Sequence, residues 1–402
     1  MKKNLALSLL AVLLLYSALE TTFLWWFPRL LPANANFFLD EGVTPLLQSS
    51  KKGIFPQNYI ALFGDSYAQG MGDWASTEMK KPMARFHTAH ILQDLTGRDV
   101  ISFGSAGSGS VRSLVTEPIA RLAYINRYTF HKVPDPDVVL VYFYEGNDMY
   151  DNADYFENSF PKLFDISLQF DEATYKHYLQ QFALEHDDLY RKAQRHDVQR
   201  YLPFASFVKL AIRVLRGLPK PDDPDHDFSV DPPWRFGTNM FKLPGHINQA
   251  NVNGQLLQLP DTIQGPAIGL NEIETRRAWF AFEQALNFSR NYFAKSRFVL
   301  VYIPSVLSAY DIRNDHISVQ GYQGHQADFT LQQAQFASAA MRKRFKEIAA
   351  QQQLQVIDTT DALRAAALLE PIHGPEDWNH LNRKGYDVLA GVIAENLRKA
   401  PD

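Results

Sequence analysis

Residues 59–66 read Tyr59-Ile60-Ala61-Leu62-Phe63-Gly64-Asp65-Ser66. An apolar run followed directly by a glycine predicts a short buried β-strand that ends in a tight turn. Strands of a parallel sheet are covered on both faces, so they are continuously apolar rather than alternating. The stretch therefore predicts an α/β fold in which Ser66 lies at the carboxyl end of a strand.

Four more segments have the same apolar character, and helical patterns lie between them. The predicted strands are Val100–Phe103, Asp137–Tyr144, Arg297–Pro304 and Leu354–Asp358. This alternation predicts a three-layer α/β/α architecture with a central, mainly parallel sheet. It breaks between about residues 150 and 270, which indicates a helical and loop insertion within a domain that spans residues 36–402.

Two segments near the C-terminus predict long amphipathic helices. The first places Phe329, Phe336, Met341, Phe345 and Ile348 on or near one stripe, and Thr330 with Gln333 resembles a capping box at its start. The second has core-facing spacing at Tyr386, Leu389, Ile393 and Leu397.

Composition narrows the class of protein. The 402 residues are 46% hydrophobic and carry a net charge of −4, so no overall basic field favours nucleic acid. The chain has no cysteine, which excludes disulfides, cysteine-ligated zinc and thiol catalysis. The histidines and carboxylates show no spacing typical of a metal site, and we expect no metal and no other cofactor.

The N-terminal segment indicates where in the cell the protein is located. Lys2 and Lys3 precede an apolar run from Leu5 to Leu19, which resumes at Phe23–Phe27. Residues 1–35 are interpreted as an uncleaved signal-anchor, with the lysines cytoplasmic and the catalytic domain periplasmic or extracellular. Two alternatives stay open: a signal peptide cleaved at Ala33-Asn34-Ala35, after which the domain is secreted, and a buried helix of a cytosolic protein.

The chemistry is suggested by a second stretch near the C-terminus, Asp377-Trp378-Asn379-His380. A serine hydroxyl is a poor nucleophile until a histidine takes its proton, and an aspartate can orient that histidine. Ser66, Gly107 and Asn147 each follow the carboxyl end of a predicted strand, which is where open α/β sheets bind ligands.

These blocks resemble those of the SGNH (GDSL) hydrolase superfamily. Gly64-Asp65-Ser66 matches the serine block, Gly107 the glycine block with Gly104 as the competing choice, and Asp377 to His380 the histidine block. The asparagine block maps onto Glu145-Gly146-Asn147-Asp148, where the glycine directly precedes the asparagine. The resemblance covers roughly residues 59–150 and 295–400.

The resemblance implies a role for each matched residue. Ser66 would be the nucleophile, His380 the base and Asp377 the residue that orients it. The Ser66 and Gly107 backbone N–H groups and the Asn147 amide would form the oxyanion hole. Taken singly, Ser66 and Asp377 could merely cap helices, Asn147 could be a turn residue and His380 a packed surface residue.

The insertion contains an apolar stripe formed by Phe204, Phe207, Val208, Ala211, Ile212 and Leu215. Positive charge lies along the same segment and after it, at Lys209, Arg213, Arg216 and Lys220. A lid or a helix on a membrane surface fits this pattern. A surface helix docked on the core fits it as well, and we rate this interpretation higher.

The leading hypothesis is a serine-dependent carboxylic-ester hydrolase that deacetylates a cell-envelope glycan. One alternative is an O-acetyltransferase that modifies an extracellular or periplasmic polysaccharide and takes acyl groups from a membrane partner. The other is a non-catalytic glycan-binding or assembly protein on the same fold.

Overall fold

The central element is a five-stranded sheet in which every neighbouring pair is parallel. A computed structural model describes residues 2–39, 41–128, 131–195, 202–216, 248–320 and 326–399. The strands are β1 (Ile60–Phe63), β2 (Val100–Ser102), β3 (Val138–Tyr144), β6 (Arg297–Ile303) and β10 (Gln355–Asp358), in the order β10-β6-β3-β1-β2. The five predicted strands and the mainly parallel sheet are confirmed, with their ends moved by a residue.

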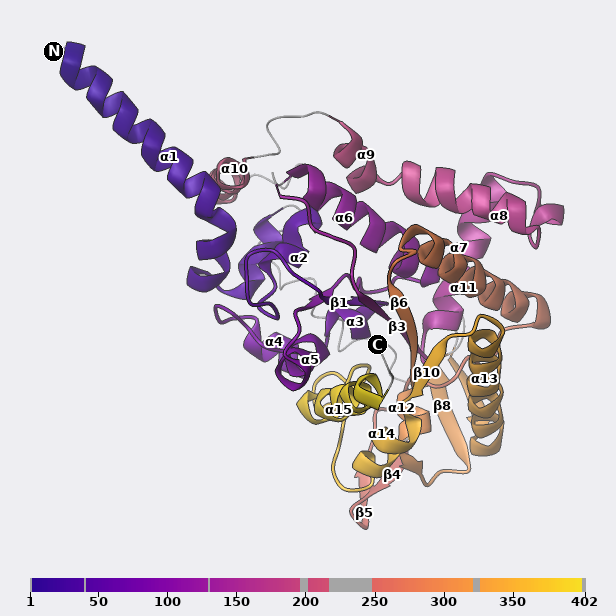
Figure 1. The fold of residues 1–402 in the computed structure, drawn as a ribbon. Coiled ribbons are helices and arrows are strands. Elements are labelled where there is room, and N and C mark those ends of the chain that lie inside the picture. Colours follow the sequence, from indigo (N-terminus) through magenta and orange to yellow (C-terminus); the bar gives the residue numbers. More distant parts are fainter. Residues whose placement is uncertain are drawn as a thin grey trace.

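Helices cover both faces of the sheet because successive strand residues point to opposite sides (Figure 1). Phe63, Phe143 and Tyr302 face one core, which is closed by α6 (Glu117–Tyr128), α7 (Asp148–Ser159), α11 (Glu272–Tyr292) and α13 (Leu331–Gln351). Leu62 and Val301 face the other, which is closed by α3 (Ser66–Gln69), α5 (Thr88–Thr96), α14 (Thr360–Ala367) and α15 (Arg383–Lys399).

The two C-terminal helices are confirmed, with a correction to the first. Thr330 and Gln333 form the expected capping box of α13, and Tyr386, Leu389 and Ile393 of α15 are fully buried. Phe329 instead belongs to strand β9 (Gln326–Thr330), and Phe336 is 77% exposed. Phe336 lies five positions before Met341, about 140° around the helix, and so misses the buried stripe.

Two small antiparallel sheets were not predicted. One consists of β4 (Gln249–Val252), β5 (Gln255–Gln258) and β7 (Asp311–Ile312), and the other of β8 (His316–Gln320) and β9. Strands β4 and β5 are short and half polar, which hides them from a search for apolar runs. Their two-residue turn, Asn253-Gly254, has positive φ at both positions and was the available hairpin signal.

The insertion is partly helical, as expected. It contains α7, α8 (Glu172–Tyr178), α9 (Asp188–Gln194) and α10 (Pro203–Leu215). Residues 196–201 and 217–247 of it lie outside the described part of the chain.

The N-terminal helix α1 (Lys2–Leu30) projects from the body of the molecule (Figure 1). Its residues 3–30 are long and apolar enough to cross a membrane or to act as a signal sequence. The two ends of α1 differ: Leu5–Leu15 are exposed, whereas Phe23 and Phe27 are fully buried in the first core. The last third of α1 is therefore part of the folded domain.

Phe27→Ala should lower the free energy of unfolding by about 3–5 kcal/mol, because it leaves a cavity in a packed aromatic cluster. Leu10→Ala, in the exposed part of the same helix, is the matched control and should leave it unchanged. Urea unfolding in detergent, followed by circular dichroism, measures both. Equal effects of the two substitutions would contradict the assignment of Phe27 to the core.

Candidate active site

Ser66 is held at the first turn of α3, directly after β1. Gly64 has φ 153°, and a Cβ there would lie 2.9 Å from Cβ of Tyr142, so the turn requires glycine. The side chain of Asp65 caps α3 by accepting the Tyr67 N–H at 2.9 Å. Ser66 is consequently fixed and buried at the carboxyl end of the strand.

The segment with Asp377 and His380 lies between α14 and α15 and is tied to the serine turn. The Asp73 carboxylate accepts the N–H groups of Glu376 at 3.0 Å and Asp377 at 2.8 Å. The Tyr67 hydroxyl donates to the Asn379 carbonyl at 2.9 Å. These bonds bring the tail of the chain against the segment that follows β1.

The two segments place three side chains in a hydrogen-bonded line. His380 Nδ1 lies 2.6 Å from Asp377 Oδ2, and His380 Nε2 lies 2.8 Å from Ser66 Oγ. A carboxylate at Nδ1 favours the tautomer that carries its proton there, which leaves Nε2 to accept from the serine hydroxyl. The arrangement can remove a proton from Ser66.

The electrostatics of Asp377 suit this arrangement. Burial raises the pKa of its carboxyl, but the hydrogen bond and charge of His380 and the Asn379 N–H outweigh burial and hold the pKa below its ordinary value. Asp377 is therefore ionised at neutral pH and can accept the hydrogen bond from His380 Nδ1.

The two candidate glycines have different surroundings. Gly107 is exposed in the turn after β2, with φ 63°. A Cβ on Gly104 would lie 2.3 Å from the Gln69 nitrogen of α3, and its N–H donates to Ser102 Oγ at 3.1 Å. Gly104 therefore serves packing against α3, whereas a Cβ on Gly107 would meet no atom within 4 Å.

Asn147 follows β3 at the start of α7. Its Nδ2 donates to Asp151 Oδ2 at 3.1 Å, and its Oδ1 is buried with no partner among the described residues. The Asp148 carboxylate accepts the Tyr144 N–H at 2.8 Å, and the Tyr144 ring stacks on Tyr67 at 4.0 Å. The asparagine turn is thus packed against the helix that carries Ser66.

Three carboxyl groups, Asp65, Asp148 and Asp151, lie close together behind the turns. Burial raises the pKa of Asp65 and, together with the charges of Asp65 and Asp151, raises that of Asp148. Burial and the charges of Asp65 and Asp154 raise the pKa of Asp151 to about 7. Among the described residues, no group of three or more His, Asp and Glu side chains could hold a metal ion.

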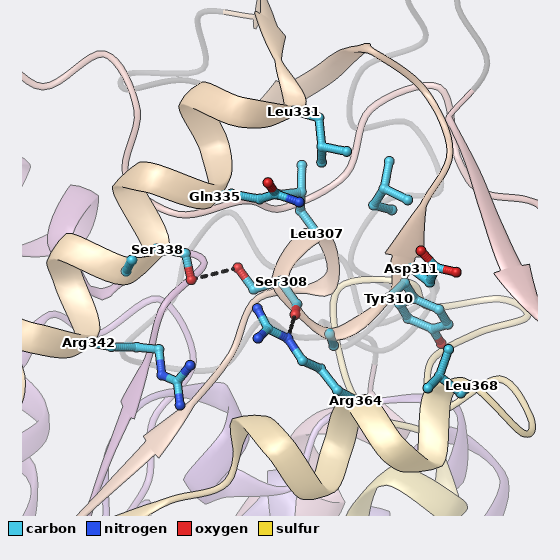
Figure 2. A pocket seen from close by; sticks show the side chains of 13 residues that line it. Leu307, Ser308, Tyr310, Asp311, Leu331, Gln335, Ser338, Arg342, Arg364 and Leu368 are labelled. Carbon is cyan, nitrogen blue, oxygen red and sulfur yellow. Dashed lines mark hydrogen bonds between the residues drawn. The ribbon is translucent and has the colours of Figure 1, made fainter.

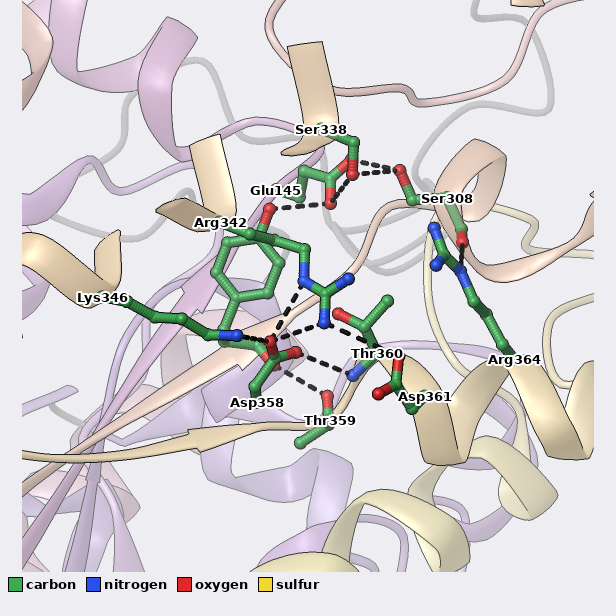
Figure 3. A network of polar contacts seen from close by, with 11 residues as sticks. Glu145, Ser308, Ser338, Arg342, Lys346, Asp358, Thr359, Thr360, Asp361 and Arg364 are labelled. Carbon is green, nitrogen blue, oxygen red and sulfur yellow. Dashed lines mark hydrogen bonds and ion pairs between the residues drawn. The ribbon is translucent and has the colours of Figure 1, made fainter. Parts of the chain in front are cut away.

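Glu145 is a site-adjacent residue that the sequence did not single out. It is fully buried. Its carboxylate accepts from the Tyr302 hydroxyl at 2.8 Å, Ser305 Oγ at 3.0 Å and Ser338 Oγ at 3.1 Å, and also from Ser308 (Figure 3). It ties the start of the asparagine turn to α12 (Val306–Ala309) and α13. The sequence feature that could have identified Glu145 is its position, because it is a charged residue directly after an apolar strand.

A cavity of about 610 Å³ lies beside this network (Figure 2). Ser308, Ser338 and Arg364 line it, and Arg364 Nε donates to the Ser308 carbonyl at 2.6 Å. Tyr310, another lining residue, has its ring 6.3 Å from that of Trp378 in the histidine segment. Tyr310 thus lies between the cavity and the loop that carries Asp377 and His380, and neither Asp377 nor His380 lines the cavity.

The chain matches no model of a known protein family, and no curated protein matches it. The geometry of this site is therefore the basis for a functional proposal.

Asp151→Asn should lessen the loss of stability that the protein undergoes as the pH rises from about 4 to 7. In that window Asp151 is ionised in the unfolded chain but still protonated in the fold, because its folded pKa of about 7 exceeds the ordinary 3.8. The folded state then binds more protons, and the free energy of unfolding falls by at most about 1.4 kcal/mol per pH unit.

Urea unfolding at several pH values measures that slope. The exposed Asp94, changed to Asn, is the control and should leave the slope as it is. An unchanged slope in Asp151→Asn would show that its carboxyl titrates normally.

Proposed function

We propose that this protein is a serine-dependent carboxylic-ester hydrolase of the SGNH type. The observation that carries the proposal is the hydrogen-bonded line from Asp377 through His380 to Ser66, at 2.6 and 2.8 Å. The sheet supports it, because the strands, counted in chain order, are arranged 2-1-3-4-5 as in flavodoxin-like folds. Ser66 and Asn147 follow the carboxyl ends of β1 and β3, where such folds bind ligands.

In the proposed reaction, Ser66 Oγ attacks the ester carbonyl carbon while His380 Nε2 takes the hydroxyl proton. Asp377 stabilises the resulting imidazolium. When the tetrahedral intermediate collapses, the carbon–oxygen bond to the alcohol breaks and His380 gives its proton to that alcohol. The acyl group remains on Ser66 until a water, deprotonated by His380, attacks it and releases the acid.

The negative charge on the tetrahedral oxygen requires hydrogen-bond donors. We assign this role to the backbone N–H groups of Ser66 and Gly107 and to the Asn147 amide. Asn147 Nδ2 carries two hydrogens, and the bond to Asp151 uses one of them. The Asn147 side chain also hydrogen-bonds the Asp65 carboxyl, so the oxyanion would compete with Asp65 for this donor.

The proposed substrate is an acylated glycan of the cell envelope. Helix α1 supports this proposal, because two lysines precede its apolar run and such a charge distribution keeps the N-terminus cytoplasmic. The domain would then face the outside of the membrane, where these glycans occur.

The full-length protein in detergent should hydrolyse a chromogenic acetyl ester and be labelled at Ser66 by a serine-reactive phosphonate. Ser66→Ala should abolish labelling and lower turnover by roughly 10⁶-fold, and Asp377→Asn should lower turnover by roughly 10⁴-fold. Ser289→Ala, at a buried serine of α11, is the control and should retain activity. A wild-type protein with neither turnover nor label would favour the glycan-binding alternative.

Acetyl transfer to a polysaccharide is the second candidate, because the hydrogen-bonded line of Asp377, His380 and Ser66 serves transfer as well as hydrolysis. The two reactions differ in whether a hydroxyl group or water reaches the acyl-enzyme. With an acetyl donor and an oligosaccharide present, a transferase adds acetyl groups to the oligosaccharide, whereas an esterase releases only acetate. Mass spectrometry of the oligosaccharide distinguishes the two outcomes.

A further inference from the structure

Residues 4–18 form the bare part of helix α1, which the rest of the domain does not cover. This part alone is too short to cross a bilayer. Residues 4–18 are exposed along one continuous stretch, and burial begins at residues 19 and 20. At 1.5 Å per residue, fifteen residues span about 22 Å, whereas the hydrocarbon core of a bilayer is about 30 Å thick. If α1 crosses a membrane, the part of the domain around residue 20 must be drawn into the membrane surface.

Glu20 marks this boundary and is engaged there. Its two carboxylate oxygens accept the backbone N–H groups of Phe204 and Ala205, each at 2.9 Å. These are free donors at the first turn of α10, and a carboxylate also opposes the positive end of the helix dipole. The acid within an otherwise apolar helix is thereby explained, because it fixes the start of α10 at the level where the bare part of α1 ends.

Aromatic contacts hold α10 across the last third of α1. Phe207 lies 5.2 Å from Phe27 and 5.9 Å from Phe23, between ring centres, and Phe204 lies 6.1 Å from Trp26. Figure 1 shows α1 lengthwise and α10 nearly end-on, so the two helices cross steeply. With α1 along the membrane normal, α10 lies close to the plane of the membrane.

The chemistry of α10 suits a lipid surface. Residues 202–217 include three basic residues and no acid. Lys209 and Arg216 are exposed and, seven positions apart, share one face, while the apolar Ile212 is 43% exposed. On α1 at the same level, Trp25 is 51% exposed and the Arg29 guanidinium lies over its ring at 4.9 Å. Exposed aromatic and basic side chains together are typical of membrane interfaces.

We propose that α10 and residues 20–30 of α1 form a membrane-docking surface whose partner is the headgroup region of a bilayer containing anionic lipid. The docking surface compensates for the short bare helix and holds the domain against the leaflet from which α1 emerges. The preferred interpretation of α10 as a surface helix docked on the core is confirmed, because Phe204 and Phe207 pack against the first core. The proposal adds a lipid-facing side to the same helix. The proposal is independent of the esterase assignment, since it concerns none of the residues at Ser66.

The absence of cysteine allows a direct test with single-cysteine variants. Ile212→Cys on α10, Leu10→Cys on the bare part of α1 and Phe336→Cys on α13 each carry a bimane label in the full-length protein. The protein is reconstituted into vesicles of neutral and anionic phospholipid, with brominated acyl chains as the quencher. Ile212 and Leu10 should be quenched at least about twofold more strongly than Phe336, which is apolar and exposed on another part of the molecule.

Quenching at Leu10 with none at Ile212 would overturn the docking surface, and would leave α10 as an ordinary surface helix. Absence of quenching at Leu10 would overturn it too, because α1 would not be inserted. In the Ile212→Cys protein, Glu20→Ala should reduce quenching by removing the cap of α10. Glu172→Ala, at an exposed acid of α8 outside the docking surface, should not. Unchanged quenching in Glu20→Ala would overturn the role of Glu20.

Discussion

The site depends on the bonds that hold the tail of the chain against the segment after β1. Asp73 receives two successive N–H groups, from Glu376 and Asp377, and Tyr67 binds the Asn379 carbonyl. Together with the bond from the Tyr386 hydroxyl to the Met71 carbonyl, these bonds fix the loop that carries His380 relative to Ser66. A proton can pass between His380 and Ser66 only at hydrogen-bond distance. The proposed reaction therefore depends on the hydrogen bonds that hold this loop in place.

Sequence reasoning succeeded where the signal was local. Each strand of the central sheet is an apolar run, and Ser66, Asn147 and His380 lie in short blocks that can be read without knowledge of the fold. Asp73 and Glu145 were missed because their roles come from partners hundreds of residues away or on other elements. The hairpin at Asn253-Gly254 was missed because its flanking strands are too polar to stand out.

Buried carboxyl groups support the turns at a cost in stability. Asp65 caps the serine helix and Asp148 holds the asparagine turn, yet burial raises the pKa of both. Glu145 also has a raised pKa, although four hydroxyl groups surround it. An ionised group out of water is unfavourable unless its hydrogen bonds compensate. Buried carboxyl groups therefore hold the proposed oxyanion donors in position, although they lower the stability of the fold.

The N-terminal helix links this fold to its location. Its bare part presents leucines to the surroundings, while Phe23 and Phe27 are core residues and Glu20 caps a helix of the insertion. Cleavage after Ala35 would remove all three of these residues from the domain. The anchored form keeps the first core intact, whereas the processed form would have to repack it. The packing that positions α10 therefore supports the proposal that the segment is retained and anchors the domain.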